Sequence, residues 1–407
     1  MRVYQFRHLP DVGHPNKQFV VLPSGDILAP MKGAFVHLVG KSYRALTPLI
    51  FLSDSEPAHD FVLDMSEMMG KVPGIPSLMR GLLRVSHPSL KTTVAGIEFE
   101  NPIGLAAGFD HEAQMPRIVD GLGFGFQSVG TVTNGAYEGN PYPRIKRLVK
   151  SRTMLVYKGF KSTGMSNVLK RIKGQTWRVP VGISVGRTNP LKEYTYPVSY
   201  ADIVEAFTKA RDSKVPFSYF ELNISCPNML KEVSFYEPEH LAPLLKMISD
   251  LKLPKPLFIK MPIGLGDDGV KALLDTIMQF PVAAVIFGNL QINRKDSAFI
   301  PEELATLEKF PGNWSGMPCQ KRSDHLVKLA YNHVKRRLAI IGCGGIFNAE
   351  DAYRKIRNGA SLVQLVSATV WEGPQVPAEI CADLPALLER DGFKNISEAV
   401  GVDAGKS

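Results

Sequence analysis

Cysteine is scarce in this chain of 407 residues, which contains only Cys226, Cys319, Cys343 and Cys381. These residues lie far apart, form no CxxC pair and follow no secretory signal sequence. We therefore expect reduced thiols in a cytoplasmic protein, and we predict no metal site. Long hydrophobic runs are also missing. None approaches the roughly 18 residues of a membrane span, so we expect a protein that is soluble or lies on a membrane surface.

Repeats and low-complexity segments are missing as well, and the charge has no strong local bias. The net charge is +9, but the basic residues are scattered apart from two modest runs at 144–152 and 335–338. Such runs are typical of solvated faces, so we predict no nucleic-acid partner. Hydrophobic residues make up 44% of the chain. That fraction is enough for a large packed core and indicates a globular protein.

From about residue 95 onward, short apolar runs alternate with amphipathic stretches. Helices are predicted over 200–213, 267–280 and 348–359, the last with Asn348 as its N-cap and Gly359 at its end. Alternating strands and helices indicate a parallel sheet, and eight such units favour a (β/α)8 barrel, or TIM barrel. A doubly wound open sheet is the alternative. The predicted strands are 101–108, 126–132, 179–186, 219–225, 257–263, 283–289, 338–345 and 361–367.

Residues 1–90 have a different pattern and are predicted to form an N-terminal accessory segment of a barrel that spans residues 91–400. A hairpin is predicted at 19–30, where the sequence SerGlyAsp suits a turn. The stretch 34–70 indicates two or three short helices with apolar faces. The predicted fold class is therefore α/β, a (β/α)8 barrel with an N-terminal helical and hairpin extension.

Polar side chains occur near the ends of three predicted strands. Asn223, Cys226 and Asn228 lie in ELNISCPN at the end of the fourth run, Lys260 lies in the fifth, and Asn289 ends the sixth. Reacting groups of (β/α)8 enzymes lie at the carboxyl ends of the strands, so we expect these side chains to meet. Asparagine also caps loops, and cysteine can be a small buried side chain. A lysine after an apolar run has no simple structural use.

Two adjacent glycines, Gly344 and Gly345, end the seventh predicted strand and precede a predicted helix. Glycine lets backbone N–H groups approach an anion, and the loops after the last two strands form the usual phosphate site of such barrels. Adjacent glycines are also common in simple turns. Their position beside the last strand favours a phosphate site.

Several longer motifs resemble the dihydroorotate dehydrogenase family of FMN flavoproteins over roughly residues 55–375. NPIGLAAGFD (101–110) is similar to the family's first-strand motif. Other stretches resemble the quinone-linked, membrane-associated class 2 enzymes, namely SEPAH (55–59), GFGFQSVGTVT (123–133), GNPYPRIKRL (139–148) and the stretch 344–374. The resemblance implies oxidation of (S)-dihydroorotate to orotate in pyrimidine biosynthesis, with FMN as cofactor and quinone as electron acceptor.

The motif ELNISCPN departs from class 2, which has serine as its catalytic base, and resembles the cytosolic class 1 pattern with cysteine. By this resemblance, Cys226 takes a proton from C5 of the substrate while hydride passes from C6 to N5 of FMN. Lys260 is expected near N1 and O2 of the flavin, and Asn223, Asn228 and Asn289 are expected to hold the substrate. A thiol assisted by a neighbouring cation suits a base near neutral pH.

The resemblance also implies the residues that contact FMN. Ser184 stands where the family usually has asparagine, so one hydrogen bond to the flavin is expected to be lost or replaced. The remaining expected contacts are Ala106, Ala107, Gly130, Thr131, Asn223, Lys260, Ser315, Gly316, Gly344, Gly345, Val366 and Ser367.

On the quinone side, the resemblance implies an apolar passage between N-terminal helices, with His59 and Arg147 beside it. These helices are expected to lie on the bilayer surface, which makes the protein peripheral on the inner membrane. Core packing is the alternative role for the same residues. The expected apolar lining is Leu46, Ile50, Phe51, Ala58, Phe61 and Val62.

Three positions on the substrate side depart from the family. His111 replaces a lysine that contacts orotate, Val156 replaces an asparagine, and Leu290 replaces a threonine. Histidine carries a weaker, pH-dependent charge than lysine, and valine removes a donor and an acceptor. His111 is still an expected substrate contact. A relative that acts on another ring, such as another pyrimidine, and a flavin-binding protein without catalysis therefore remain as alternatives.

Overall fold

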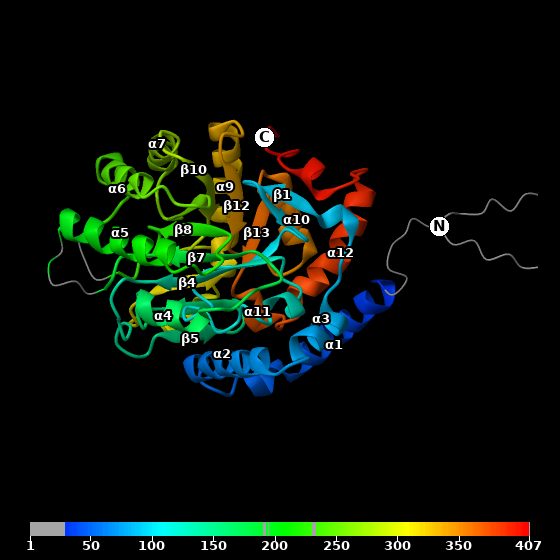
Figure 1. Ribbon diagram of the computed structural model, residues 1–407. Helices are drawn as coiled ribbons and strands as arrows, with labels where there is room; N and C mark the ends of the chain where they lie inside the picture. Colours follow the sequence, from blue (N-terminus) through cyan, green and yellow to red (C-terminus); the bar gives the residue numbers. More distant parts are fainter. Residues whose placement is uncertain (1–28, 190–192, 194, 230–232, 407) are drawn as a thin grey trace, which may run out of the picture.

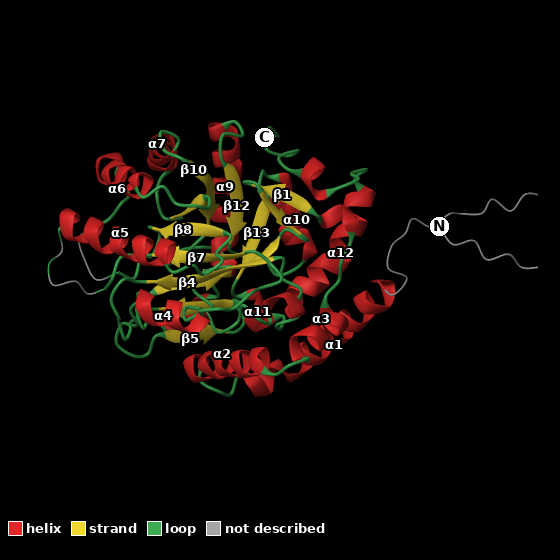
Figure 2. Cartoon of the chain, viewed as in Figure 1, coloured by secondary structure: helices red, strands yellow, loops and turns green. Residues whose placement is uncertain are grey.

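The computed structural model describes residues 29–406 apart from 190–192, 194 and 230–232. Most of the predicted hairpin, residues 19–28, lies outside the described residues, and Ala29 already begins helix α1. The predicted (β/α)8 barrel is confirmed. Eight parallel strands close in the order β10-β12-β13-β3-β4-β7-β8-β9, which excludes the open sheet, and Figure 2 shows the strands enclosed by helices.

Each predicted strand corresponds to one strand of the barrel, although most are shorter than expected. Buried apolar side chains on both faces are typical of parallel strands, and nearly every residue of these strands is buried. The strands are β3 Ile103–Leu105, β4 Phe126–Val132, β7 Val181–Val185, β8 Tyr219–Asn223, β9 Leu257–Met261, β10 Val282–Phe287, β12 Ala339–Cys343 and β13 Leu362–Leu365.

The inside of the barrel is filled by large aromatic side chains. Tyr219 stacks on Phe258 with ring centroids 4.6 Å apart. Phe126 fills the space beside Gly104, where an added Cβ would lie 2.3 Å from the ring. The hairpin of β1 (Thr92–Val94) and β2 (Ile97–Phe99) is the floor of the barrel, because Phe99 packs edge-on against Phe126 at 5.2 Å. The amino end of the barrel is therefore closed, and a ligand site is left to the carboxyl end.

Helices cover the outside of the sheet and bury their apolar faces against it. The predicted helices at 200–213, 267–280 and 348–359 are confirmed within a few residues, and the Asn348 side chain accepts a hydrogen bond from the Asp351 backbone N–H at 2.8 Å. The outer helices are α4 Met165–Ile172, α5 Tyr196–Asp212, α6 Pro238–Asp250, α7 Asp267–Ile277, α9 Gln320–Val334, α10 Ala349–Arg357 and α12 Val376–Arg390.

A small antiparallel sheet at the carboxyl end of the barrel was not predicted. Its order is β11-β6-β5, with β5 Ile145–Leu148, β6 Thr153–Val156 and β11 Asn313–Gly316. The short helices α8 (Pro301–Ala305) and α11 (Ala368–Trp371) complete the loops on this side.

The N-terminal segment forms three helices, α1 Ala29–Ile50, α2 Ser55–Lys71 and α3 Ile75–Leu83, which lie along one side of the barrel's mouth (Figure 1). Helix α1 is longer than predicted and tolerates Pro48 in its last turn. Helix α3 is fastened by Arg80 and Arg84, which both pair with the buried Asp120.

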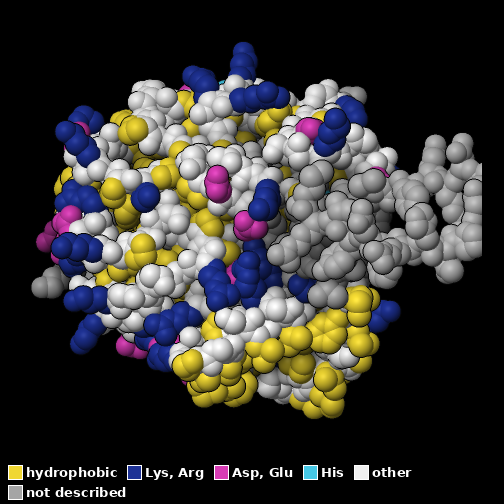
Figure 3. All heavy atoms as spheres, turned by 45° about the vertical axis from the view of Figure 1, so that its right-hand side comes forward, with side chains coloured by type: hydrophobic (Ala, Val, Ile, Leu, Met, Phe, Trp, Pro, Cys, Tyr) yellow, Lys and Arg dark blue, Asp and Glu magenta, His cyan; other side chains and the backbone are white. Residues whose placement is uncertain are grey.

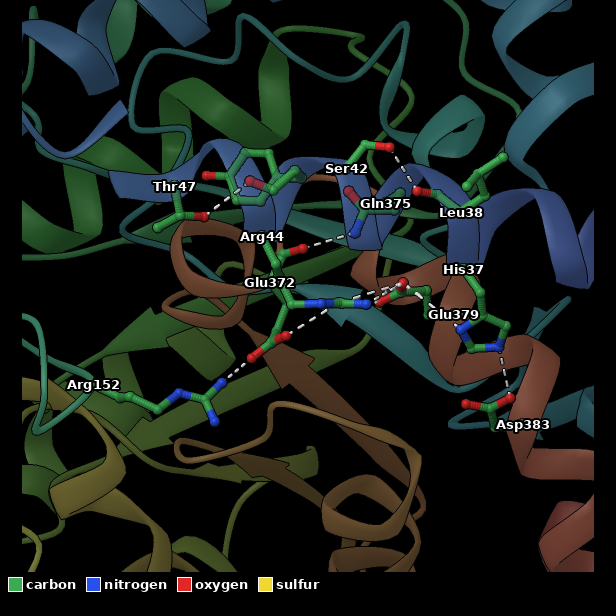
Figure 4. A network of polar contacts seen from close by, with 11 residues as sticks. His37, Leu38, Ser42, Arg44, Thr47, Arg152, Glu372, Gln375, Glu379 and Asp383 are labelled. Carbon is green, nitrogen blue, oxygen red and sulfur yellow. Dashed lines mark hydrogen bonds and ion pairs between the residues drawn. The ribbon is translucent and has the colours of Figure 1, made fainter. Parts of the chain in front are cut away.

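Helix α1 is held on the barrel by a network of ion pairs (Figure 4). Arg44 lies 3.2 Å from carboxylate oxygens of both Glu372 and Glu379, and Arg152 also pairs with Glu372. His37 bonds to Asp383 at 2.9 Å. The helices approach so closely that a Cβ on Gly40 would overlap the Glu379 carboxylate. This network holds α1 beside the mouth of the barrel, where the helix forms one wall of a cavity.

Candidate active site

A single cavity of about 520 Å³ opens at the carboxyl ends of the strands and continues between the N-terminal helices. Asn223, Cys226, Asn228, Lys260 and Asn289 all line it. The sequence therefore predicted correctly that polar groups from three separate strands meet at one place. Such convergence at the carboxyl face is where (β/α)8 enzymes carry their chemistry.

The two adjacent glycines form one side of this cavity. Gly344 has φ +100° and Gly345 has φ +68°, and a Cβ on Gly345 would lie 2.3 Å from Cβ of Gln320. Any side chain there would collide with the start of α9. Nearby, the Ser315 and Ser367 hydroxyl oxygens are 2.6 Å apart. Close backbone approach together with two hydroxyls is the donor set that a phosphate group prefers.

Most of the expected cofactor contacts line the cavity. Ala106, Gly130, Ser184 and Gly316 do not line it; Ala106 and Ser184 are fully buried in the barrel wall. Those that do are Ala107, Thr131, Asn223, Lys260, Ser315, Gly344, Gly345, Val366 and Ser367.

Lys260 presents a buried cation to the cavity. It lies opposite Asn223 in the pairing of β8 with β9, is 3% exposed, and donates a hydrogen bond to the Ala107 carbonyl at 3.3 Å. Within the described residues, no carboxylate oxygen lies within 4.0 Å of its ammonium nitrogen. A buried cation without an anionic partner favours a ligand that carries or develops negative charge.

The three asparagines are oriented by hydrogen bonds to the protein. Asn223 Nδ2 donates to Thr131 Oγ1 at 2.6 Å, and its Oδ1 accepts from the Ser225 hydroxyl at 2.7 Å. Asn289 donates to the same Ser225 hydroxyl. Asn228 Nδ2 donates to the carbonyl of Val156 at 2.8 Å. Each side-chain amide nitrogen has a second N–H, so a ring bound in the cavity can still receive hydrogen bonds from these fixed positions.

Cys226 carries a free thiol whose partial exposure is to the cavity. Burial raises the pKa of this thiol to about 11, although the Asn228 backbone N–H and the Lys260 cation both act to lower it. The thiol is therefore protonated at neutral pH in this structure. As a base it would have to lose its proton first, and a higher pH favours that loss.

A buried carboxylate that the sequence analysis missed lies beneath these groups. Glu221 is fully buried and accepts hydrogen bonds from Ser128 Oγ at 2.6 Å and from Ser184 Oγ at 2.7 Å. Ser184 is also 3.1 Å from Thr131 Oγ1, which bonds to Asn223. The hydroxyl of Ser184 therefore links the Glu221 carboxylate to Thr131 and, through Thr131, to Asn223. An acidic residue inside the apolar strand YFELN was the signal that could have revealed Glu221.

A second group that sequence reasoning missed is Lys158, which lines the cavity after β6. Its ammonium lies 3.2 Å from Nδ1 of His59, while His59 Nε2 bonds to the Phe109 carbonyl at 2.8 Å. His111 stacks on His59 with ring centroids 6.0 Å apart. Burial lowers the pKa of both histidines and lowers the pKa of Lys158 to about 8. At neutral pH the two rings are therefore neutral, and Lys158 is the cation of this cluster.

The cavity continues from the strand ends into an apolar passage bounded by α1, α2 and α3. All of the expected lining residues face it except Leu46, which is 53% exposed on the outer side of α1. His59 and Arg147 also line it. The Arg147 guanidinium lies over the Phe51 ring at 4.5 Å, and its Nε donates to Ser55 Oγ at 2.9 Å. Methionines 65, 69, 79 and 115 complete the lining with flexible, apolar side chains.

Comparison with known proteins gives a consistent result. A family model described as "Dihydroorotate dehydrogenase" matches residues 89–388. A protein of Thermobifida fusca named "Dihydroorotate dehydrogenase (quinone)" is 34% identical over 363 residues, which cover 87% of this chain and 94% of the relative. One of Gloeobacter violaceus with the same name is 33% identical and covers 88% and 98%.

Solved structures agree with the sequence comparison. The crystal structure of an Eimeria tenella protein titled DHODH in complex with ferulenol is 26% identical and superposes with a TM-score of 0.76. The match covers 86% of this chain and 96% of that one. A ligand-free structure of the same protein matches equally well, with a TM-score of 0.76.

Proposed function

The chain belongs to the dihydroorotate dehydrogenase family, and from this we propose that it oxidises (S)-dihydroorotate to orotate with FMN as cofactor and a quinone as electron acceptor. The observation that carries the proposal is the single cavity in which a thiol, a buried cation and three oriented amides adjoin an apolar passage. The polar part suits a small polar ring, and the apolar part suits a lipophilic acceptor.

The residues present fit FMN. Gly344 and Gly345 line the cavity as a glycine cradle whose backbone packs so closely on Cys319 and Gln320 that an added Cβ would collide with them. The hydroxyls of Ser315 and Ser367 line the same cavity, and this donor set suits a phosphate. Lys260 offers an unpaired buried cation, which suits the negative charge of a reduced flavin ring. FMN, when bound, supplies the atom that accepts the hydride from C6 of the substrate.

The remaining chemistry is proton transfer and positioning by this chain's own residues. Cys226 removes the proton from C5 of the substrate with Sγ once its own thiol is ionised, and Lys260 stabilises the negative charge that develops in the reaction. Asn223, Asn228 and Asn289 orient the ring, because each is already fixed by the protein on its other side. Fixed donors do not have to reorganise during the reaction, and this is the basis of their catalytic effect.

The apolar passage supports quinone as the acceptor, and the surface around it supports peripheral binding to a membrane. Figure 3 shows apolar side chains gathered along the lower edge of the molecule, where Figure 1 has helices α1 to α3. In residues 29–406, outside the short undescribed gaps, no helix is long and apolar enough to cross a membrane. Exposed apolar residues on these helices are Met31, Phe35, Leu38, Leu46, Leu49, Ile50, Phe61, Val62, Met68, Leu78 and Leu82.

An assay of orotate formation tests the proposal. Purified protein loaded with FMN is given dihydroorotate and a short-chain quinone analogue, and orotate is followed by its absorbance. We expect turnover that depends on both additions. Absence of flavin reduction by dihydroorotate would contradict the proposal.

A second candidate substrate is favoured by two features of the cavity lining. Val156 presents no polar side chain to the cavity, and His111 is neutral there because burial lowers its pKa. These changes suit a dihydropyrimidine without a carboxylate. Dihydrouracil added in the same assay separates the two, since only this second candidate predicts faster flavin reduction by dihydrouracil than by dihydroorotate.

A further inference from the structure

The cavity contains a second buried cation, and the protein does not neutralise it. Lys158 is 9% exposed, and among the described residues the one direct hydrogen-bond partner of its ammonium is the neutral ring of His59. In the part of the chain that the structure describes, no carboxylate oxygen lies within 4.0 Å of its ammonium nitrogen. Burying a cation without an anion is costly, so an anionic ligand would bind favourably there.

The nearby charges do not serve as that anion. Glu56 pairs with the buried Arg144 at 2.9 Å. Asp60 is directed at His59, 3.8 Å from its Nδ1, and is 43% exposed. Lys161 adds a further positive charge at the same end of the cavity. Burial lowers the pKa of Lys158, and Glu56 and Asp60 only partly offset this effect, so the ammonium remains short of negative charge.

His59 leaves the ammonium free to bind a ligand. Its Nε2 must carry the proton, because it donates to the carbonyl of Phe109. Nδ1 is then an acceptor for one N–H of Lys158, and the ammonium keeps two more.

His111 has an unpartnered ring nitrogen beside this cation. The residue is 7% exposed, and within the described residues its Nδ1 has no hydrogen-bond partner. An unsatisfied buried nitrogen is unfavourable unless a ligand completes it. A neutral imidazole with its proton on Nδ1 would donate to an anion that also contacts Lys158.

The backbone ties Lys158 to the loop that carries the candidate base. Asn140 connects the two segments, since its N–H donates to the Lys158 carbonyl at 3.1 Å and its side chain donates to the Asn228 carbonyl at 3.0 Å. Asn228 in turn donates to the carbonyl of Val156, two residues before Lys158. The cation is therefore fixed relative to Cys226 and the substrate amides.

We infer that Lys158, with the neutral ring of His111 beside it, is the subsite that binds the carboxylate of the substrate. The inference rests on the proposed function and extends it, because it makes Lys158 the residue that selects a carboxylated dihydropyrimidine over one without the group. The ammonium supplies the charge, and His111 supplies a hydrogen bond without a charge of its own.

Binding of orotate and uracil to the FMN-loaded enzyme, measured by calorimetry, tests this role apart from turnover. Lys158→Met removes the charge and keeps the length of the side chain. A hydrogen bond to a charged group corresponds to roughly 10- to 100-fold in affinity, so we expect orotate to bind about 30-fold more weakly and uracil to change less than about threefold. Lys158→Arg should restore most of the orotate affinity. Lys161→Met removes the same charge three residues away. It should lower the affinity for orotate less than about threefold, because that more exposed charge is screened.

The outcomes separate the subsite from the proposed function. If Lys158→Met lowers the affinities for orotate and uracil equally, or changes neither affinity, Lys158 only balances the charges of Glu56 and Asp60, and the inference is overturned. If the wild-type enzyme binds orotate through Lys158 but does not oxidise dihydroorotate, the proposed function fails and the subsite stands.

A pH series gives a test that does not depend on the folding of Lys158→Met. The pKa of Lys158 is lowered to about 8, so its charge is lost as the pH rises through that value. Wild-type affinity for orotate should fall between pH 8 and pH 9, and Lys158→Arg, whose guanidinium stays protonated, should lack this fall. The same fall in both proteins would overturn the inference.

Discussion

Replacing Cys226 by serine should slow proton removal while leaving the cofactor site intact, because Cys226 is not among the residues expected to contact FMN. The magnitude follows from the thiol's pKa of about 11. At pH 7 only about one thiol in 10⁴ is ionised, and the ionised fraction increases about tenfold per pH unit until the pKa is reached. Flavin reduction at saturating dihydroorotate should increase with the same slope between pH 7 and pH 9.

Serine is far less acidic than cysteine, so the variant lacks a usable base in this range. Loss of a positioned base typically slows a reaction by about 10²–10⁴-fold. We expect the rate of flavin reduction to be about 10²-fold lower in the variant, and its increase with pH to begin at a higher pH than in the wild-type protein. The assay is anaerobic stopped-flow bleaching of the flavin. Cys381→Ala is the matched control, since Cys381 is buried outside the cavity, and its reduction rate should equal that of the wild-type protein.

Two results would refute this reasoning. A wild-type reduction rate that does not change with pH would show that ionisation of the thiol is not required. Equal rates for the serine variant and the wild-type protein would show that Cys226 is not the base, and it would then be a buried packing residue.

The remaining predictions concern the cofactor, the N-terminal helices and the membrane. Gly345→Ala, whose Cβ would lie 2.3 Å from Gln320 Cβ, should weaken FMN binding at least about tenfold. Gly392→Ala, with a similar φ but open space around it, should not weaken FMN binding. Equal FMN retention by the two variants would contradict a role of Gly345 in the cofactor site. Arg44→Met removes the ion pairs of Arg44 with Glu372 and Glu379 (Figure 4) and should lower the free energy of unfolding in urea by about 1–2 kcal/mol. Arg390→Met, which loses a surface ion pair with Asp391, should leave it unchanged. Leu49→Asp together with Leu78→Asp should reduce sedimentation with anionic liposomes by about tenfold or more, and Met247→Asp on α6 should have no effect; undiminished binding by the double variant would place the membrane contact elsewhere.

The eight strands could be predicted because each is a short apolar run buried on both faces, a pattern that the sequence shows directly. The sheet formed by β5, β6 and β11 could not. Its register joins Ser315 to Met154 across more than 150 positions, and segments such as IKRL and NWSG have no alternating pattern of their own. Long-range pairing of this kind is decided by tertiary contacts.

Candidate site residues could be predicted where they lie at the ends of regular strands. Lys158 was missed because its significance depends on His59, which comes from a helix about 100 positions earlier and meets it only in the fold. Leu46 was expected in the passage, but the helical turn carries it to the outer side of α1. The pKa of the Cys226 thiol could not be predicted from the sequence either, because the burial that raises this pKa is a property of the folded cavity.

The central claim, oxidation of dihydroorotate with transfer of electrons to quinone, is tested most directly by an anaerobic two-step experiment. One equivalent of dihydroorotate is added to the FMN-loaded protein, followed by a quinone analogue, with fumarate and NAD⁺ in parallel samples. We predict bleaching of the flavin with formation of one equivalent of orotate, then recovery of the flavin spectrum with quinone only. A flavin that dihydroorotate does not bleach, or that fumarate or NAD⁺ reoxidises as fast as quinone, would contradict the account.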